Sequence, residues 1–192
     1  MKGSLKNIKI IALGDSLTQG YPYDIKASWV NILNSEKGFN IINKGINGDT
    51  LEGMLKRFYG DVAAYRPDLV IIMGGTNDAF NGFSLSSMEN NLKNIVKKAL
   101  DTGIRPIIGI PLPVDEPAVE EKLCKFREFV REYCCDKNIA YIDFYTPLVG
   151  SNGRIKEEMD FDGIHPNKQG YRAMAIEAYK ILSNYIYRLS FE

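Results

Sequence analysis

The sequence predicts an α/β fold in which a five-stranded parallel sheet is covered by helices on both faces. Five short apolar runs alternate with segments whose apolar residues recur every three or four positions, the order typical of such folds. The runs are apolar throughout, which favours strands that are buried on both faces. Polar segments that contain glycine follow the first three runs.

The first half of the chain contains two expected strands and two expected helices. Residues 8–13 form an apolar run that gives way to a polar segment, which indicates the end of a strand. Apolar residues at helical spacing indicate a short helix over residues 27–33, and a second apolar run covers residues 39–43. A helix over residues 51–58 follows a polar segment that holds two glycines.

The rest of the chain repeats this alternation, with apolar runs for strands and three-and-four spacing for helices. In chain order we expect a strand at 68–73, a helix at 85–99, a strand at 105–110, a helix at 119–130, a strand at 139–144 and a final helix from about 167 to 188. Glycine or proline lies close to the end of several of these segments.

Composition narrows the class of protein. A chain of 192 residues can bury one sizeable core, so we expect a single domain over residues 1–192. Lys plus Arg equals Asp plus Glu at 24 each, so nucleic acid and other large polyanions are not expected partners. The apolar run near the start is too short for a signal peptide or a membrane span, so we expect a cytoplasmic protein without stable membrane insertion. Nothing in the sequence specifies an oligomeric state.

The three cysteines, Cys124, Cys134 and Cys135, fall in one expected helix. Adjacent cysteines are poorly placed to bridge each other, so we expect reduced cysteines that mostly pack in the core. One histidine and three cysteines confined to one helix do not make a usual zinc ligand set. We therefore expect no bound metal and no cofactor.

The chain contains a single histidine, His165, in the segment Asp162-Gly-Ile-His-Pro-Asn167. A serine hydroxyl is a poor nucleophile until a neighbouring base takes its proton, and imidazole titrates in the range for this near neutral pH. Ser16, just after the first strand, is the natural partner of this histidine. Asp162 can hold the other ring nitrogen, and Pro166 is expected to begin the last helix.

A tetrahedral intermediate formed by attack of Ser16 also requires donors for the oxygen that gains negative charge. Loss of one such donor raises the barrier by about 3 kcal/mol. The backbone N–H of Ser16, the backbone N–H of Gly48 and the side-chain amide of Asn77 are candidates, because glycine permits close approach and the amide donates without a charge.

Four segments in chain order resemble the sequence blocks of the SGNH, or GDSL, hydrolases. They are Gly14-Asp-Ser-Leu-Thr18 with Gly20, Asn43-x-Gly-x-x-Gly48, Gly75-Thr-Asn-Asp78 and Asp162-x-x-His165, and the match spans residues 8–170. The resemblance implies a flavodoxin-like three-layer fold and an esterase or acylhydrolase that acts on a small-molecule acyl ester. It makes Ser16 the nucleophile, Gly48 and Asn77 oxyanion donors, His165 the base and Asp162 its orienting partner.

The resemblance does not fix the acyl or alcohol group. Tyr21, Phe80 and Val114 are candidates for an apolar substrate pocket, and Asp15 is a further candidate substrate contact, although bracing of its loop is the more natural role. Asp78 is also expected to brace its loop. A small domain without an obvious lid insertion favours short acyl groups.

Two other classes of function fit parts of the sequence. A polar loop after the first strand can cradle the phosphate of a flavin or nucleotide, but such a module would not need Asp162 and His165. A magnesium phosphatase would use Asp15, Asp78 and Asp162, since hard cations prefer carboxylates. Flavin absorbance would favour the first alternative, and activity lost to EDTA the second.

Overall fold

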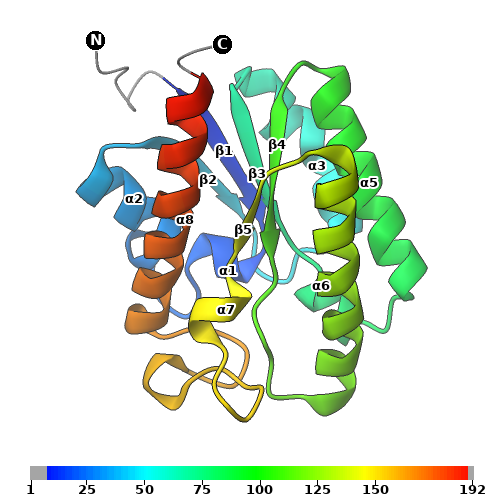
Figure 1. The fold of residues 1–192 in the computed structure, drawn as a ribbon, viewed down its shortest axis with the longest axis vertical. Coiled ribbons are helices and arrows are strands. Elements are labelled where there is room, and N and C mark those ends of the chain that lie inside the picture. The colour runs from blue at the N-terminus through cyan, green and yellow to red at the C-terminus, as the bar shows by residue number, and fades with distance from the viewer. Residues whose placement is uncertain (1–7, 190–192) are drawn as a thin grey trace.

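Five parallel strands form the sheet at the centre of the structure, a computed structural model that describes residues 8–189 (Figure 1). Their order across the sheet is β2-β1-β3-β4-β5, the flavodoxin-like order. The strands are β1 (Lys9–Gly14), β2 (Asn40–Gly45), β3 (Leu69–Met73), β4 (Arg105–Ile110) and β5 (Tyr141–Asp143). The predicted fold class is confirmed, although β5 is shorter than the apolar run at residues 139–144 suggested.

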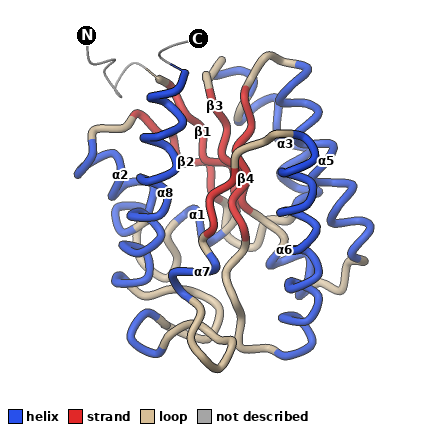
Figure 2. Tube along the Cα trace, viewed as in Figure 1, coloured by secondary structure: helices blue, strands red, loops and turns tan. Residues whose placement is uncertain are grey.

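Helices cover both faces of this sheet (Figure 1 and Figure 2). One face carries α2 (Trp29–Lys37) and α8 (Lys168–Leu189), and the other carries α3 (Leu51–Asp61), α5 (Leu85–Asp101) and α6 (Pro117–Lys137). Short helices are α1 (Ser16–Gln19), α4 (Thr76–Phe80) and α7 (Tyr145–Leu148), with 3₁₀ turns η2 (Ile25–Ala27), η3 (Ala63–Tyr65) and η4 (Glu157–Met159).

The central strands β1, β3 and β4 each supply side chains to two cores, because successive residues of a strand point to opposite faces. In β1, Ile10 and Ala12 belong to the core under α2 and α8, whereas Ile11 and Leu13 belong to the core under α3, α5 and α6. All four are fully buried. This double burial explains why the strands read as continuous apolar runs in the sequence.

The strand order reverses next to β1, because the chain moves outward from β1 to β2 and then crosses back to β3. Ligands of open α/β sheets bind at the carboxyl ends of the strands beside such a reversal. The short helices α1 and α4 directly follow β1 and β3 at this edge. The fold therefore brings the first and third polar segments to one place.

Asn167 caps the last helix, α8. Its Oδ1 accepts hydrogen bonds from the N–H groups of Gln169 and Gly170, at 2.8 and 3.1 Å. The expectation that Pro166 begins the helix is wrong, because the first helical residue is Lys168. A side-chain oxygen at this position satisfies N–H groups that the first helical turn leaves free.

The three cysteines are unpaired, as predicted. Cys134 is buried, and burial raises the pKa of its thiol to about 12. Cys124 and Cys135 are exposed, so the expectation that the cysteines mostly pack in the core is correct for Cys134 alone.

Among residues 8–189, no helix combines the length and the apolar character that crossing a membrane requires.

Candidate active site

Ser16 is the first residue of α1, where the sequence suggested a loop. Asp15 caps this short helix, since its Oδ1 accepts a hydrogen bond from the N–H of Leu17 at 2.9 Å. Gly14 is required by packing: a Cβ there would collide with Thr18 and with the carbonyl of Met73. The Gly-Asp-Ser sequence therefore lets the chain turn sharply out of β1 and hold the serine at the edge of the sheet.

The hydroxyl of Ser16 lies 3.1 Å from Nε2 of His165, although the two residues are 149 positions apart in the sequence. The other ring nitrogen, Nδ1, lies 2.9 Å from Oδ2 and 3.1 Å from Oδ1 of Asp162. Hydroxyl, imidazole and carboxylate thus form a continuous line of hydrogen-bonding groups. This is the arrangement in which an imidazole can take a proton from a serine.

Asp162 is held in its charged form by the loop that carries it. Burial raises the pKa of this carboxyl, but hydrogen bonds from the backbone and ring of His165 and from the N–H of Ile164 outweigh it, so the pKa lies below its ordinary value. The N–H groups of His165 and Ile164 donate to Oδ1 at 2.8 and 3.1 Å. A carboxylate fixed in this way favours the imidazole tautomer with its proton on Nδ1.

The loop before α8 is tied down on several sides. Both carboxylate oxygens of Asp160 accept from the N–H of Gly163, at 2.9 and 3.1 Å. The N–H of Asp115 donates to the carbonyl of Gly163 at 2.6 Å. The ring of Tyr21 lies edge-on to the ring of His165, with 4.6 Å between centroids. The imidazole therefore has few orientations open to it.

Gly48 and Asn77 come from the second and third polar segments. Gly48 has φ +76° in a turn closed by a hydrogen bond from the N–H of Asp49 to the carbonyl of Ile46, 3.1 Å. A Cβ at Gly48 would meet nothing, so the backbone angle is what favours glycine there. Nδ2 of Asn77 donates to the carbonyl oxygen of Asp49 at 2.9 Å, which leaves its second amide hydrogen available.

Two buried carboxyls lie beneath this site. Both oxygens of Asp78 accept from the N–H of Leu51, at 3.2 and 3.0 Å, so Asp78 ties α4 to the start of α3. Burial raises the pKa of Asp78 to about 6 and that of Asp15 to about 7. Neither side chain is exposed to solvent. Bracing, which we expected of both residues, is the role their positions support.

Asp15 and Val114, the other two expected substrate contacts, are buried at 0% and 2% exposure, so their role in substrate contact stays a prediction. Val114 packs in the core under α6, and its N–H donates to the carboxylate of Glu120 at 3.0 Å. Tyr21 and Phe80 are each 40% exposed, and Phe80 lies three residues after Asn77. These two aromatic residues remain candidates for contact with substrate.

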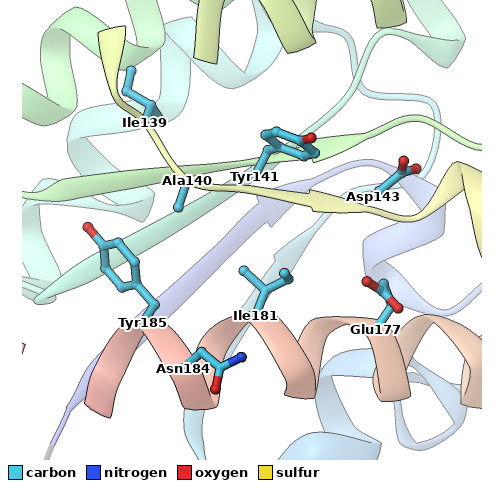
Figure 3. Close-up of a pocket in the computed structure, with 8 residues that line it drawn as sticks. All are labelled: Ile139, Ala140, Tyr141, Asp143, Glu177, Ile181, Asn184 and Tyr185. Atoms are coloured by element: carbon cyan, nitrogen blue, oxygen red, sulfur yellow. The ribbon is translucent and has the colours of Figure 1, made fainter. Parts of the chain in front are cut away.

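Three cavities of about 500 Å³ lie elsewhere, and neither Ser16 nor His165 lines them. One lies between β5 and α8 and is lined by side chains that include Tyr141, Glu177 and Ile181 (Figure 3).

Within residues 8–189 no group of three or more His, Cys, Asp or Glu side chains is arranged to hold a metal ion. The three carboxylates of the magnesium alternative are thus not gathered into a metal site.

Two residues near the site, Asp49 and Arg57, were not predicted from the sequence. Asp49 contacts Asn77 through its backbone carbonyl, and no side-chain pattern reveals such a contact. Arg57 lies on α3 between Met54 and Phe58, which are both fully buried. The position of Arg57 on the apolar face of an amphipathic helix could have revealed it, because a charged side chain is seldom buried without a partner.

A known protein family contains the segments that carry Ser16, Gly48, Asn77 and His165 in the same order along the chain. A sequence model of the GDSL-like lipase/acylhydrolase family matches residues 12–173. The chain belongs to this family. It is a GDSL-type ester hydrolase, and the flavin- or phosphate-binding alternative is not favoured.

Individual relatives of this GDSL-family chain cover most of its length. It is 29% identical over 164 residues to esterase TesA of Pseudomonas aeruginosa, and the match covers 82% of this chain and 79% of that protein. It is 34% identical over 166 residues to the arylesterase of Vibrio mimicus, with 84% and 81% covered. The crystal structure of a member of the lipolytic G-D-S-L family from Veillonella parvula matches with a TM-score of 0.82 and 28% identity, over 91% of this chain and 98% of that one.

Proposed function

We propose that this GDSL-family chain hydrolyses small acyl esters through an acyl-serine intermediate, with Ser16 as the nucleophile. The contact of 3.1 Å between the Ser16 hydroxyl and Nε2 of His165 carries the proposal. With its proton on Nδ1, bonded to Asp162, the imidazole offers the lone pair of Nε2 to the serine hydroxyl. His165 is then the general base, and Asp162 stabilises the imidazolium that forms.

The reaction has two halves. Oγ of Ser16 bonds to the ester carbonyl carbon while His165 takes the hydroxyl proton, and the bond to the alcohol oxygen then breaks as His165 returns that proton to the leaving alcohol. Water next attacks the acyl carbon while His165 takes a proton from it, and the bond to Oγ then breaks as His165 returns that proton to Ser16 and the carboxylic acid leaves. No group other than water and the ester is consumed.

The oxyanion of the tetrahedral intermediate requires donors that are fixed in advance. We assign this role to the N–H groups of Ser16 and Gly48 and to the side-chain amide of Asn77. Among residues 8–189, neither backbone N–H donates to another protein atom, so both are available. The hydrogen bond from Asn77 to Asp49 supports the assignment of Asn77 and Gly48 to one oxyanion hole, because it holds the amide of Asn77 beside the turn that contains Gly48.

Short acyl groups are the substrates we favour. No inserted subdomain covers Ser16 in the part of the chain that the structure describes, and the neighbouring rim carries exposed apolar side chains, including Tyr21, Ile46 and Phe80. Such a rim can contact a small acyl or aryl group without enclosing a long chain. In a series of nitrophenyl esters, kcat/KM should be highest for the short acyl chains and fall as the chain lengthens.

The decisive experiment removes the two reacting groups in turn. Ser16→Ala and His165→Ala should each abolish hydrolysis of nitrophenyl acetate while the circular dichroism spectrum stays unchanged. Ser151→Ala is a matched control, because Ser151 is an exposed serine outside the site, and it should keep full activity. Full activity in either of the first two variants would refute the assignment.

We further propose that the protein works in the cytoplasm. The three unpaired cysteines support this, since free thiols persist in reducing compartments. Fractionation of the native host, with an antibody against the protein, tests the proposal. Recovery of the protein outside the cytoplasm would contradict it.

A further inference from the structure

Arg57 connects two of the segments that build the candidate site. Its guanidinium, on a side chain that is 16% exposed, makes three charge-assisted hydrogen bonds. Nε donates to Oδ2 of Asp49 at 2.7 Å, Nη1 to Oδ2 of Asp61 at 2.9 Å, and Nη2 to the backbone carbonyl of Gly14 at 2.9 Å. Gly14 ends β1 two residues before Ser16, and Asp49 closes the turn that contains Gly48, so the side chain of Arg57 holds both the strand end and that turn.

Asp49 passes this constraint to the proposed oxyanion donors. Its carbonyl oxygen accepts from Nδ2 of Asn77 at 2.9 Å, and its N–H closes the turn that contains Gly48. Its Oδ1 accepts from the N–H of Thr50 at 2.9 Å. A movement of Asp49 would therefore displace Gly48 and Asn77 together.

We propose that Arg57 is a positioning residue for the oxyanion hole. It clamps the end of β1 to Asp49, so that the N–H of Ser16, the N–H of Gly48 and the amide of Asn77 keep their relative places. This inference rests on the proposed function, because the three donors matter only if an oxyanion forms there. Lysine cannot replace the clamp, since a single ammonium lacks the planar fork that reaches three acceptors at once.

Charge gives Arg57 a second effect on the same site. Asp61 has two cationic partners, Arg57 and Lys44, the latter at 3.0 Å. Asp49 is only 11% exposed, and in the described part of the chain Arg57 is the cation that pairs with it. Without Arg57, the carboxylate of Asp49 would be unneutralised close to the place where the transition state gains negative charge, which disfavours that state.

The first test compares Arg57→Met with Lys44→Met. Lys44 is the matched control, because it shares Asp61 with Arg57, and no bond from it reaches Asp49 or Gly14 in the described chain. We expect Arg57→Met to lower kcat for nitrophenyl acetate about 10- to 100-fold with KM within about twofold, since the lost contacts act on the transition state. Lys44→Met should stay within about twofold of the wild type in kcat. An unchanged kcat in Arg57→Met, or an equal loss in both variants, would overturn the inference.

A double-mutant cycle with Asn77→Ala separates positioning from general stability. If Arg57 acts through the oxyanion donors, the loss in kcat of the double variant should be smaller than the product of the two single losses. Fully multiplicative losses would contradict the proposal. If Arg57→Met fails to fold, Arg57→Lys serves in its place, because lysine keeps the positive charge but lacks the planar guanidinium. The kcat of Arg57→Lys should still fall while its KM stays unchanged. A kcat equal to that of the wild type would contradict the proposed role of Arg57.

The proposed function can fail separately from this inference. An inactive wild type, or an active Ser16→Ala variant, would remove the proposed function before Arg57 is considered. An active wild type, an inactive Ser16→Ala variant and an unaffected Arg57→Met variant would refute the role of Arg57 alone.

Discussion

Asn77 donates from Nδ2 to the backbone carbonyl of Asp49 at 2.9 Å, and this bond ties the third polar segment of the chain to the second. The amide thereby has one hydrogen fixed and one left to donate to a ligand. Because Asp49 directly follows Gly48, the bond also sets where Asn77 lies relative to the glycine N–H. Asp49 therefore positions both the amide of Asn77 and the N–H of Gly48, although these two groups come from different segments of the chain.

Removal of that amide should lower the rate of reaction more than the binding of substrate. For Asn77→Ala we expect kcat to fall by about 10²- to 10³-fold with little change in KM, as for other oxyanion donors. Steady-state kinetics with nitrophenyl acetate measures both constants. A variant that raises KM but keeps its kcat would show that Asn77 contacts the ground state instead.

Asp162→Asn tests the orientation of the imidazole. Asparagine keeps an oxygen for the N–H groups of Ile164 and His165, so the loop should hold its shape. Its amide favours the wrong tautomer of His165, so kcat should fall by about 10³- to 10⁴-fold. Thermal unfolding should shift by only a few degrees. If Asp162→Asn retains most of its activity, the carboxylate does not orient the base.

Asp15→Asn should change how stability depends on pH. In the folded protein burial raises the pKa of Asp15 from 3.8 to about 7, so between these values the folded chain holds a proton that the unfolded chain has lost. The contribution of Asp15 to stability is therefore complete below about pH 4 and is lost as the pH rises to about 7. Asparagine can still cap α1 but has no such proton to lose.

Denaturant unfolding of both proteins at several pH values measures this effect. From about pH 5 to about pH 7, the stability of the wild type relative to Asp15→Asn should fall, with a slope of at most about 1.4 kcal/mol per pH unit. Asp78, with a pKa raised to about 6, acts in the same direction in both proteins, and its charge also helps to raise the pKa of Asp15. Parallel pH profiles would show that Asp15 stays ionised when buried.

Chelation distinguishes the serine mechanism from a magnesium-dependent one. Asp162 is bonded to His165, Asp78 to the N–H of Leu51, and Asp15 is buried at the start of α1. We therefore expect hydrolysis of nitrophenyl acetate to survive EDTA unchanged. Loss of activity that added Mg²⁺ restores would contradict the mechanism.

The fold could be predicted because each strand has a strong local signal. Burial on both faces makes the central strands β1, β3 and β4 largely apolar runs, and glycine marks where the first three expected strands end. The contact between Ser16 and His165 was also within reach, since the chain offers one histidine and sheet topology brings the strand ends together.

Features that depend on tertiary contacts could not be predicted in this way. The four residues of α1 are too few to show a helical period, so Ser16 looked like a loop residue. Asp15 is polar and lies beside the nucleophile, yet it is fully buried where it caps α1. The bond from Arg57 to the carbonyl of Gly14 joins residues 43 positions apart, a link that no local pattern contains.

Covalent labelling tests the nucleophile most directly. A fluorophosphonate reacts with a serine that an adjacent base has activated, and the adduct can be located by peptide mass spectrometry. We expect a single adduct on Ser16 in the wild type, with none in Ser16→Ala and a much slower reaction in His165→Ala. An adduct on a different residue, or equal labelling of His165→Ala and the wild type, would show that His165 does not activate Ser16.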